Sequence, residues 1–402
     1  MTPFSLLVKP ASADCNLRCR YCFYRDACTF YPQNGRRRMG DATLDRMIAG
    51  YMATKQPVHA FGWQGGEPTL MGVDFYRRAV ELQAAYAQPG TRIANGLQTN
   101  GTLLDDEFAA FLGEYRFLVG VSLDGPAAVH DAERRTAGGQ GSHAMVLSGI
   151  ECLRRNRVEF NILTLVNLTN VSKPVEVYDY LVEQGFCYHQ YIECVEFAPD
   201  GTPQPFAITG QAWGDFLCRL FDRWYPRDTR RVSVRLFDTV LAIIVNGVAN
   251  SCASSENCCQ YFVVEHNGDV YPCDFHVRPS RKLGNVTTDG WMTLQQSPAY
   301  AAFGERKRQW NARCARCAFL QFCQGDCPKN RGGPENQDST RLSHLCEGWG
   351  QFYRHTLPRF QKLAEAIRRE RRQFHAASGI GPENTSITPG WAERGKRANS
   401  LS

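Results

Sequence analysis

Short apolar runs alternate with amphipathic segments through the first half of the chain. The runs with β-strand character lie at residues 4–8, 58–63, 91–98, 117–123, 158–166 and 187–195. Between them, apolar side chains recur at helical spacing in residues 43–53, 73–87, 105–113, 143–156 and 174–184. Strands joined in this way by helices form a parallel sheet with right-handed crossovers. Six such units are fewer than the eight of a closed barrel, so the pattern predicts an α/β fold built on a partial, open (βα)6 TIM-like barrel.

The pattern changes past about residue 205. Two helices are expected at 211–225 and 236–246, followed by a cysteine-rich segment. Within that segment, an Asn-Gly pair between two apolar runs predicts a tight β-hairpin over 262–271. An amphipathic, basic helix is expected at 351–374, and the polar residues beyond it are expected to be disordered. We therefore divide the chain into a barrel, a helical connector, a C-terminal cysteine-rich domain, a helix and a tail, at residues 1–205, 206–250, 251–350, 351–374 and 375–402.

Composition narrows the possible partners. A net charge of +6 is mild, and part of it lies in the basic run 368–372, so we expect no nucleic-acid partner. No run approaches the roughly 18 apolar residues of a membrane span, and residues 1–10 lack the anatomy of a signal peptide. We expect a cytoplasmic protein that does not enter membranes. No coiled-coil seam is present, so we expect a monomer.

The seventeen cysteines are unusually many for such a protein, and their grouping suggests metal chemistry. Cys15, Cys19 and Cys22 have the spacing C-x3-C-x2-C. Three thiolates can hold three corners of a 4Fe–4S cluster, which leaves the fourth iron free for another ligand. Zinc would need a histidine as fourth ligand, and the nearest one in sequence is His59.

The later cysteines form a second concentration. Two four-cysteine clusters would use eight of the nine, whereas a zinc ribbon would use four and leave several unexplained. The sequence therefore favours two accessory iron–sulfur clusters in this domain. The nine are Cys252, Cys258, Cys259, Cys273, Cys314, Cys317, Cys323, Cys327 and Cys346.

Two further segments follow predicted strands. Residues 65–68 read Gly-Gly-Glu-Pro after the second strand, and residues 122–125 read Ser-Leu-Asp-Gly after the fourth. Each is also a common turn sequence. Because ligands of parallel α/β folds bind at the carboxyl ends of the strands, both segments are expected at one shared site with the first cysteine group.

The first cysteine group, with an aromatic residue at Tyr21 and Phe23, resembles the signature of the radical S-adenosylmethionine (SAM) superfamily. The resemblance implies that SAM binds the open iron and is cleaved to a 5′-deoxyadenosyl radical. It also implies a set of SAM contacts, in which Gly65 and Gly66 let the backbone approach the cofactor's amino group. The set is Tyr21, Gly65, Gly66, Glu67, Ser122, Asp124, Arg134 and Val195.

The later cysteines resemble the SPASM extension of peptide-modifying radical SAM enzymes. Over almost its whole length the chain is similar to the anaerobic sulfatase-maturating enzymes, in stretches such as 22–24, 64–69, 97–102, 121–126 and 271–275. The resemblance implies three 4Fe–4S clusters. It assigns the two accessory clusters to Cys252, Cys258, Cys273 and Cys327, and to Cys314, Cys317, Cys323 and Cys346. Cys259 lies beside Cys258, so the choice between these two stays open.

This family resemblance implies oxidation of a sulfatase cysteine or serine to Cα-formylglycine by hydrogen abstraction from Cβ. The target lies in an unfolded Cys/Ser-x-Pro/Ala-x-Arg segment, and a flavodoxin or ferredoxin supplies electrons. Asp274, directly after Cys273, is the candidate base for the thiol or hydroxyl proton. Four residues at strand ends are expected near SAM or peptide, although each could equally be structural: Tyr24, Gln64, Gln98 and Asn100.

Two alternatives remain. A SPASM enzyme could instead form thioether or carbon–carbon crosslinks in another peptide, although such enzymes often carry an N-terminal recognition domain for which we expect no room. A non-catalytic iron–sulfur or zinc scaffold would cleave no SAM. That alternative would leave the Gly-Gly-Glu-Pro loop and the three-cysteine site without a purpose.

Overall fold

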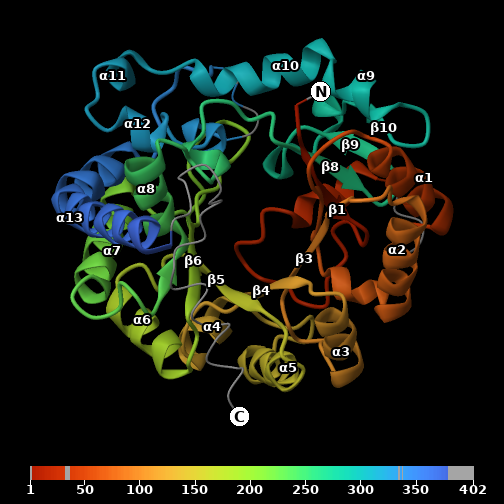
Figure 1. Cartoon of the computed structure of the whole chain (residues 1–402), viewed down its shortest axis with the longest axis horizontal. Helices are drawn as coiled ribbons and strands as arrows, with labels where there is room; N and C mark the ends of the chain where they lie inside the picture. The colour runs from red at the N-terminus through yellow and green to blue at the C-terminus, as the bar shows by residue number, and fades with distance from the viewer. Residues whose placement is uncertain (1, 32–36, 334–335, 337, 379–402) are drawn as a thin grey trace.

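A single ten-stranded sheet organises the chain (Figure 1). The computed structural model describes residues 2–31, 37–333, 336 and 338–378. The strand order is β10-β9-β8-β1-β2-β3-β4-β5-β6-β7, and the two ends of the sheet do not meet. The six predicted strands are confirmed, and they pair in parallel as β1 (Ser5–Lys9), β2 (His59–Trp63), β3 (Ile93–Thr99), β4 (Leu118–Ser122), β5 (Phe160–Val166) and β6 (Tyr188–Glu193). The open, partial barrel is confirmed with them.

Helices link these strands in the predicted order. Their start signals are local: the Asp105 side chain accepts a hydrogen bond from the Phe108 amide, and Pro174 opens a later helix. The linking helices are α1 (Asp41–Met52), α2 (Val73–Tyr86), α3 (Asp106–Glu114), α4 (Ala127–Glu133), α5 (His143–Arg155) and α6 (Pro174–Glu183). Of these, α4 was not predicted, because it is only two turns long.

The predicted hairpin is confirmed as β8 (Tyr261–Glu265) and β9 (Asp269–Tyr271). A feature that the sequence did not reveal is the parallel pairing of β8 with β1, in which Lys9 lies opposite Glu265. A short strand, β10 (Gly284–Asn285), continues the sheet on the far side of β9. The cysteine-rich domain is therefore joined to the barrel by the covalent backbone and also by hydrogen bonds between β8 and β1.

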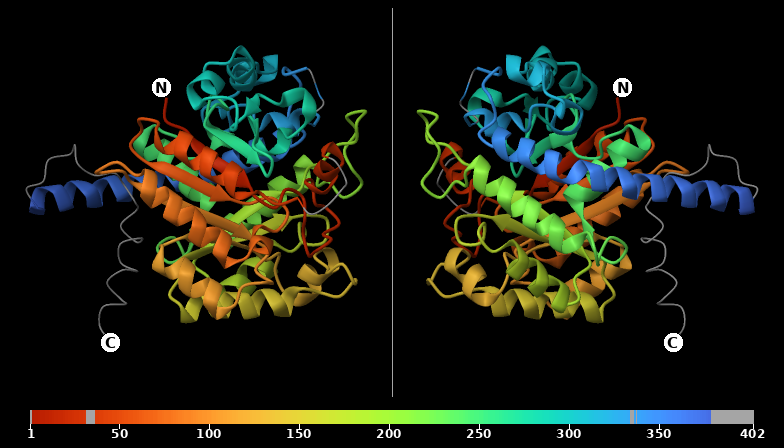
Figure 2. Two further views of the ribbon diagram at one scale, coloured as in Figure 1. Left: turned by 90° about the vertical axis from the view of Figure 1, so that its right-hand side faces the viewer. Right: turned by 90° about the vertical axis from the view of Figure 1, so that its left-hand side faces the viewer.

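Three long helices pack beside the other end of the sheet. They are α7 (Gly210–Trp224), α8 (Arg235–Asn246) and α13 (Cys346–Ser378). In the sequence, the short strand β7 (Ser233–Val234) comes between α7 and α8. Aromatic side chains pack against one another where these helices meet. The ring centroids of Phe221 on α7 and Phe360 on α13 lie 4.7 Å apart. The last helix begins earlier and ends later than predicted, and Figure 2 shows its C-terminal half extending past the rest of the molecule.

Short helices shape the cysteine-rich domain and two loops of the barrel. The α-helices are α9 (Trp291–Gln295), α10 (Pro298–Glu305), α11 (Ala312–Ala315) and α12 (Leu320–Cys323). The 3-10 helices are η1 (Arg25–Phe30), η2 (Pro68–Met71), η3 (Cys252–Ser254), η4 (Asp274–His276), η5 (Pro279–Arg281), η6 (Arg306–Arg308) and η7 (Pro328–Arg331). Among the described residues, no helix has the length and apolar character needed to cross a bilayer. The predicted tail lies outside the described residues from 379 onward.

Candidate cofactor and substrate site

The first cysteine group lies on the loop between β1 and η1, at the carboxyl end of β1. As whole residues, Cys15 and Cys22 are exposed and Cys19 is half-buried. Their thiols nevertheless lie deep among protein atoms, and this desolvation raises the pKa of Cys15 to about 12, with Cys19 and Cys22 acting in the same direction. Because iron binds the thiolate, metal binding must displace these protons.

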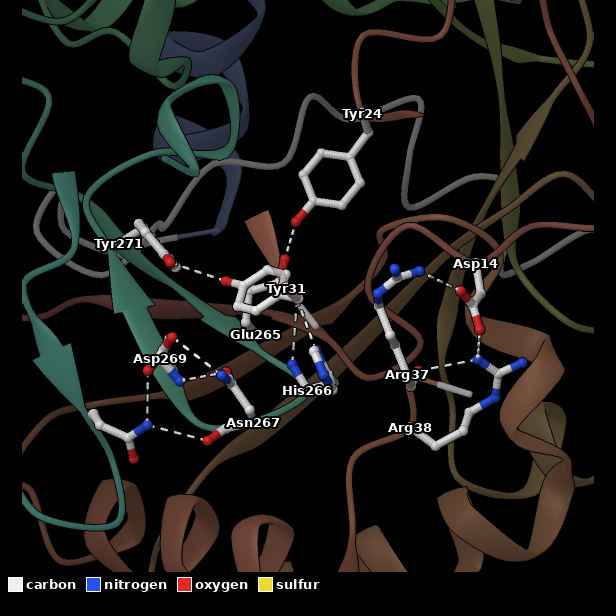
Figure 3. Close-up of polar contacts among 11 residues, drawn as sticks. Asp14, Tyr24, Tyr31, Arg37, Arg38, Glu265, His266, Asn267, Asp269 and Tyr271 are labelled. Carbon is white, nitrogen blue, oxygen red and sulfur yellow. Dashed lines mark hydrogen bonds and ion pairs between the residues drawn. The ribbon is translucent and has the colours of Figure 1, made fainter. Parts of the chain in front are cut away.

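The Gly-Gly-Glu-Pro loop packs directly on this cysteine loop. A Cβ atom at Gly66 would lie 2.0 Å from the Asp14 carbonyl oxygen, so no larger residue fits. The Glu67 amide donates to the same oxygen over 2.7 Å. Asp14 in turn accepts from Arg38 at 2.6 Å, a contact drawn in Figure 3. The glycine at position 66 is therefore explained by the close approach of two backbones.

The carboxylate of Glu67 is completely buried. One oxygen accepts hydrogen bonds from the Thr69 amide, the Thr69 hydroxyl and the Thr99 hydroxyl at 3.0, 2.6 and 2.7 Å. The other accepts from the Asn100 amide at 2.7 Å. Burial raises the pKa of Glu67, and these four bonds act against it. Since protein donors occupy the carboxylate, this side chain ties the loop to the end of β3.

Three of the predicted SAM contacts form one buried group. The Tyr21 hydroxyl donates to the Asp124 carboxylate and accepts from Arg134 Nη1 at 3.0 Å. The second Asp124 oxygen accepts from the Leu165 amide at 3.0 Å. Arg134 Nε is buried and has no hydrogen-bond partner among the described residues. An orphaned guanidinium N–H near the thiols of Cys19 and Cys22 fits an anionic group such as the carboxylate of SAM.

The remaining predicted contacts lie at neighbouring strand ends. Gln98 Nε2 donates to the Ser122 hydroxyl over 3.3 Å, across β3 and β4. Val195, just after β6, is completely buried. Asn100 donates to Asn16 Oδ1 at 2.8 Å and contacts the Cys15 sulfur at 3.7 Å. In this structure Asn100 therefore anchors the cysteine loop.

Asp274 is held between two residues of the barrel. Gln64 Nε2 donates to one carboxylate oxygen over 2.8 Å, and the Lys9 ammonium contacts the other. Lys9 is buried, and its nitrogen lies 3.5 Å from the centre of the Tyr24 ring. The structure thus brings three predicted site residues together and adds Lys9, which the sequence analysis missed. The signal was a charged residue at the end of an apolar strand.

Figure 3 shows that the Tyr24 hydroxyl points at Glu265 on β8, to which it donates a hydrogen bond. Glu265 is completely buried and also contacts His266 Nδ1 at 3.3 Å. Tyr24 thereby connects the cysteine loop to the accessory domain.

The first accessory group includes Cys273, which directly precedes Asp274. Burial raises the pKa of the Cys258 thiol, and the Cys252 thiol adds to the rise, so the two sulfurs lie near one another. The Cys273 thiol accepts a hydrogen bond from the Tyr261 hydroxyl at 3.4 Å. Cys259 points elsewhere: its thiol donates to the Tyr300 carbonyl at 3.1 Å. This orientation favours Cys258 over Cys259 as the ligand.

The second accessory group encloses a cavity of about 110 Å³ at the start of α13. Its wall holds all four cysteines of the predicted set, namely Cys314, Cys317, Cys323 and Cys346. Four thiols around one cavity fit an all-cysteine iron–sulfur cluster. No group of three or more His, Cys, Asp or Glu side chains in the described ranges is arranged for a single metal ion.

Comparisons with known proteins agree with this geometry. A sequence model of the radical SAM superfamily matches residues 10–181, and one of an iron–sulfur cluster-binding domain, SPASM, matches residues 241–318. The chain is 35% identical to the serine-type anaerobic sulfatase-maturating enzyme of Bacteroides thetaiotaomicron, over 89% of this chain and 90% of that protein. It is 34% identical to the cysteine-type enzyme of Clostridium perfringens, over 92% of this chain and all of that protein (100%).

Comparison with solved structures also finds proteins that bind S-adenosylmethionine. The structure of native anSMEcpe with bound AdoMet and Cp18Cys peptide has a TM-score of 0.84 and 34% identity, and the match covers 91% of this chain and 100% of that one. Streptococcus suis SuiB bound to S-adenosylmethionine has a TM-score of 0.61 and 16% identity, and the match covers 86% of this chain and 77% of SuiB. The second likeness shows a common fold only.

Proposed function

The chain belongs to the anaerobic sulfatase-maturating enzymes of the radical SAM superfamily, and we propose a role for each of its site residues. The enzyme uses SAM and iron–sulfur clusters to convert a cysteine or serine of a peptide substrate to formylglycine. We propose three clusters in all. One is held by Cys15, Cys19 and Cys22, and the accessory clusters are held by Cys252, Cys258, Cys273 and Cys327, and by Cys314, Cys317, Cys323 and Cys346.

When bound at the first site, the cluster and SAM supply the radical that removes a hydrogen atom from the target Cβ. The chain's own residues orient that chemistry. Arg134 is suited to hold the cofactor carboxylate, since its Nε is buried and unpaired. The backbone of Gly65 and Gly66 is suited to receive the amino group, and Glu67 keeps that loop in place. Tyr21, Ser122, Asp124 and Val195 complete the proposed contacts.

Asp274 is the proposed base, and its setting is the observation that carries the assignment. Its carboxylate lies at the boundary between barrel and accessory domain, oriented by Gln64 and Lys9 and adjacent in sequence to Cys273. There it can accept the thiol or hydroxyl proton of a target residue while an electron passes to the neighbouring accessory cluster. Tyr24, Gln64, Gln98 and Asn100 remain candidates for substrate contact.

The proposed reaction balances without a further oxidant. The target loses a hydrogen atom to the radical, a proton to Asp274 and an electron to an accessory cluster. A cysteine target then becomes a thioaldehyde, which water converts to the aldehyde with release of hydrogen sulfide. A serine target gives the aldehyde directly. We propose a sulfatase Cys/Ser-x-Pro/Ala-x-Arg segment as substrate and a flavodoxin or ferredoxin as reductant, for a monomer acting in the cytoplasm.

The test is an anaerobic assay with SAM, dithionite and matched cysteine and serine peptides, followed by mass spectrometry. Asp274→Asn should still form 5′-deoxyadenosine, because the SAM site does not include this residue, but should yield little formylglycine, because its amide accepts from only one of Gln64 and Lys9 and takes up no proton. Asp200→Asn, on an exposed loop, serves as the control and should match the wild type. A normal aldehyde yield from Asp274→Asn would exclude this residue as the base.

A further inference from the structure

Lys307 is a completely buried lysine of the cysteine-rich domain. It is the central residue of η6, and its ammonium donates to the Ala253 carbonyl at 2.8 Å and to the Asp326 carbonyl at 2.6 Å. Ala253 follows Cys252, and Asp326 precedes Cys327. The ammonium therefore clamps together two loops that each supply a ligand to the first accessory site.

The hydrogen-bond partners of this ammonium are both neutral carbonyls. Within the described part of the chain it has no carboxylate partner, because the Asp326 side chain bonds instead to Asn330 at 3.0 Å and to Ser343 at 2.6 Å. A buried ammonium without a counter-charge is unfavourable. Thiolates and the clusters that they hold carry negative charge, so the bound clusters are its natural counter-ions.

The charge reaches cysteines of both groups. The Asp326 carbonyl, to which the ammonium donates, lies on the short segment between Cys323 of the second group and Cys327 of the first. The Ala253 carbonyl, the other acceptor, directly follows Cys252 of the first group. A single charge is thus placed to act on two cluster sites.

A second buried cation fixes Lys307 in place. The Arg331 guanidinium donates to the Lys307 carbonyl at 3.1 Å and to the Gly325 carbonyl at 2.9 Å. It also bonds to the Asp326 carbonyl, which Lys307 contacts from its own side. These bonds hold the η6 backbone against the loop that carries Cys323 and Cys327, so the ammonium has little freedom to move away.

We propose that Lys307 is a positioning residue that tunes the accessory clusters, stabilising their reduced form so that they can accept the electron released by the substrate. One-electron reduction adds a negative charge to a cluster, and a fixed cation nearby favours that state in a medium of low dielectric constant. The step is a transfer of one electron from the substrate-derived radical to an oxidised accessory cluster. This inference rests on the proposed function only for the source of the electron.

The test compares neutral and charged replacements in the iron-loaded enzyme. Lys307→Gln keeps a hydrogen-bond donor without the charge, and Lys307→Arg keeps the charge. Lys282→Met removes an exposed lysine of the same domain, paired with Asp269, and is the matched control. Redox titration followed by electron paramagnetic resonance gives the midpoint potential of each cluster. Iron analysis gives the cluster content.

Lys307→Gln should lower the equilibrium constant for accessory-cluster reduction about tenfold, which corresponds to about 59 mV for one electron. The potential of the SAM-cleaving cluster should stay unchanged, and Lys307→Arg should resemble the wild type. If Lys307→Gln lacks accessory iron while Lys307→Arg retains it, the charge holds the clusters in place rather than tuning their reduction, and the proposal is wrong. Unchanged potentials with full iron, or equal damage from both variants, would overturn it.

These potentials are measured without substrate, so the result does not depend on whether the enzyme makes formylglycine. Failure of the wild type to modify a sulfatase peptide would count against the proposed function alone. If both hold, Lys307→Gln should also form more 5′-deoxyadenosine per formylglycine than the wild type, because the electron leaves the substrate radical less readily.

Discussion

The environment of Glu67 allows one substitution to be worked through in detail. In Glu67→Gln one carboxylate oxygen becomes an amide nitrogen. Keeping the three bonds from Thr69 and Thr99 places that nitrogen against the Asn100 N–H, which donates to the carboxylate over 2.7 Å. Two donors then face each other in a completely buried position.

The expected cost follows from these contacts. The variant loses a hydrogen bond to a charged acceptor and leaves a buried N–H unsatisfied, and each effect is worth about 1–3 kcal/mol. Removing a buried charge offsets part of this loss, since burial raises the pKa of Glu67 and so disfavours its ionised form. We expect a net loss of about 1–3 kcal/mol in the free energy of unfolding. SAM binding should weaken, because the Gly-Gly-Glu-Pro loop is no longer tied to β3.

Urea unfolding of the iron-free chain measures the first effect, and equilibrium binding of SAM to the reconstituted enzyme measures the second. Thr99→Val is the comparison: it removes one of the three donors to a single oxygen and also the acceptor of the Gly101 amide, so it should cost about 1–3 kcal/mol. Equal stability and SAM affinity in Glu67→Gln and the wild type would refute the conclusion that Glu67 ties the Gly-Gly-Glu-Pro loop to β3.

Two further predictions concern the accessory domain and the connector. Cys258→Ser should lower the iron content by about one cluster per chain, whereas Cys259→Ser, whose thiol bonds to Tyr300, should keep it; the reverse result would exchange the two assignments. Burial raises the pKa of Asp238 to about 6, above its value of about 4 in an unfolded chain. Between these pH values the unfolded state loses its proton first, so stability falls as pH rises, by at most about 3 kcal/mol. Asp238→Asn should abolish this part of the pH dependence and unfold at higher urea than the wild type at pH 8, and parallel stability–pH curves would contradict it.

Features encoded within a few residues were predictable from the sequence. The barrel strands follow from apolar runs, and the β8–β9 hairpin follows from its Asn-Gly turn. The pairing of β8 with β1 was not predictable, because it joins segments far apart in the chain and leaves no periodic signal in either.

The same limit applies within the site. The cysteine spacing predicted the cofactor chemistry, because three candidate ligands on one short loop are a local pattern. The contact between Lys9 and Asp274 depends on how the accessory domain packs against the barrel. The sequence around either residue therefore does not predict it. The orientation of Cys259 is likewise set by its contact with Tyr300, which lies on α10.

The pairing of β1 with β8 has a consequence for dissecting the protein. A chain cut at residue 250 would keep all six barrel strands but would leave one side of β1 without its hydrogen-bonding neighbour. An exposed, apolar edge strand is a template for intermolecular pairing, so such a fragment should aggregate. Transplanting the barrel into another enzyme therefore requires a replacement for β8, and the boundary for any chimera belongs after β9, beyond the hairpin.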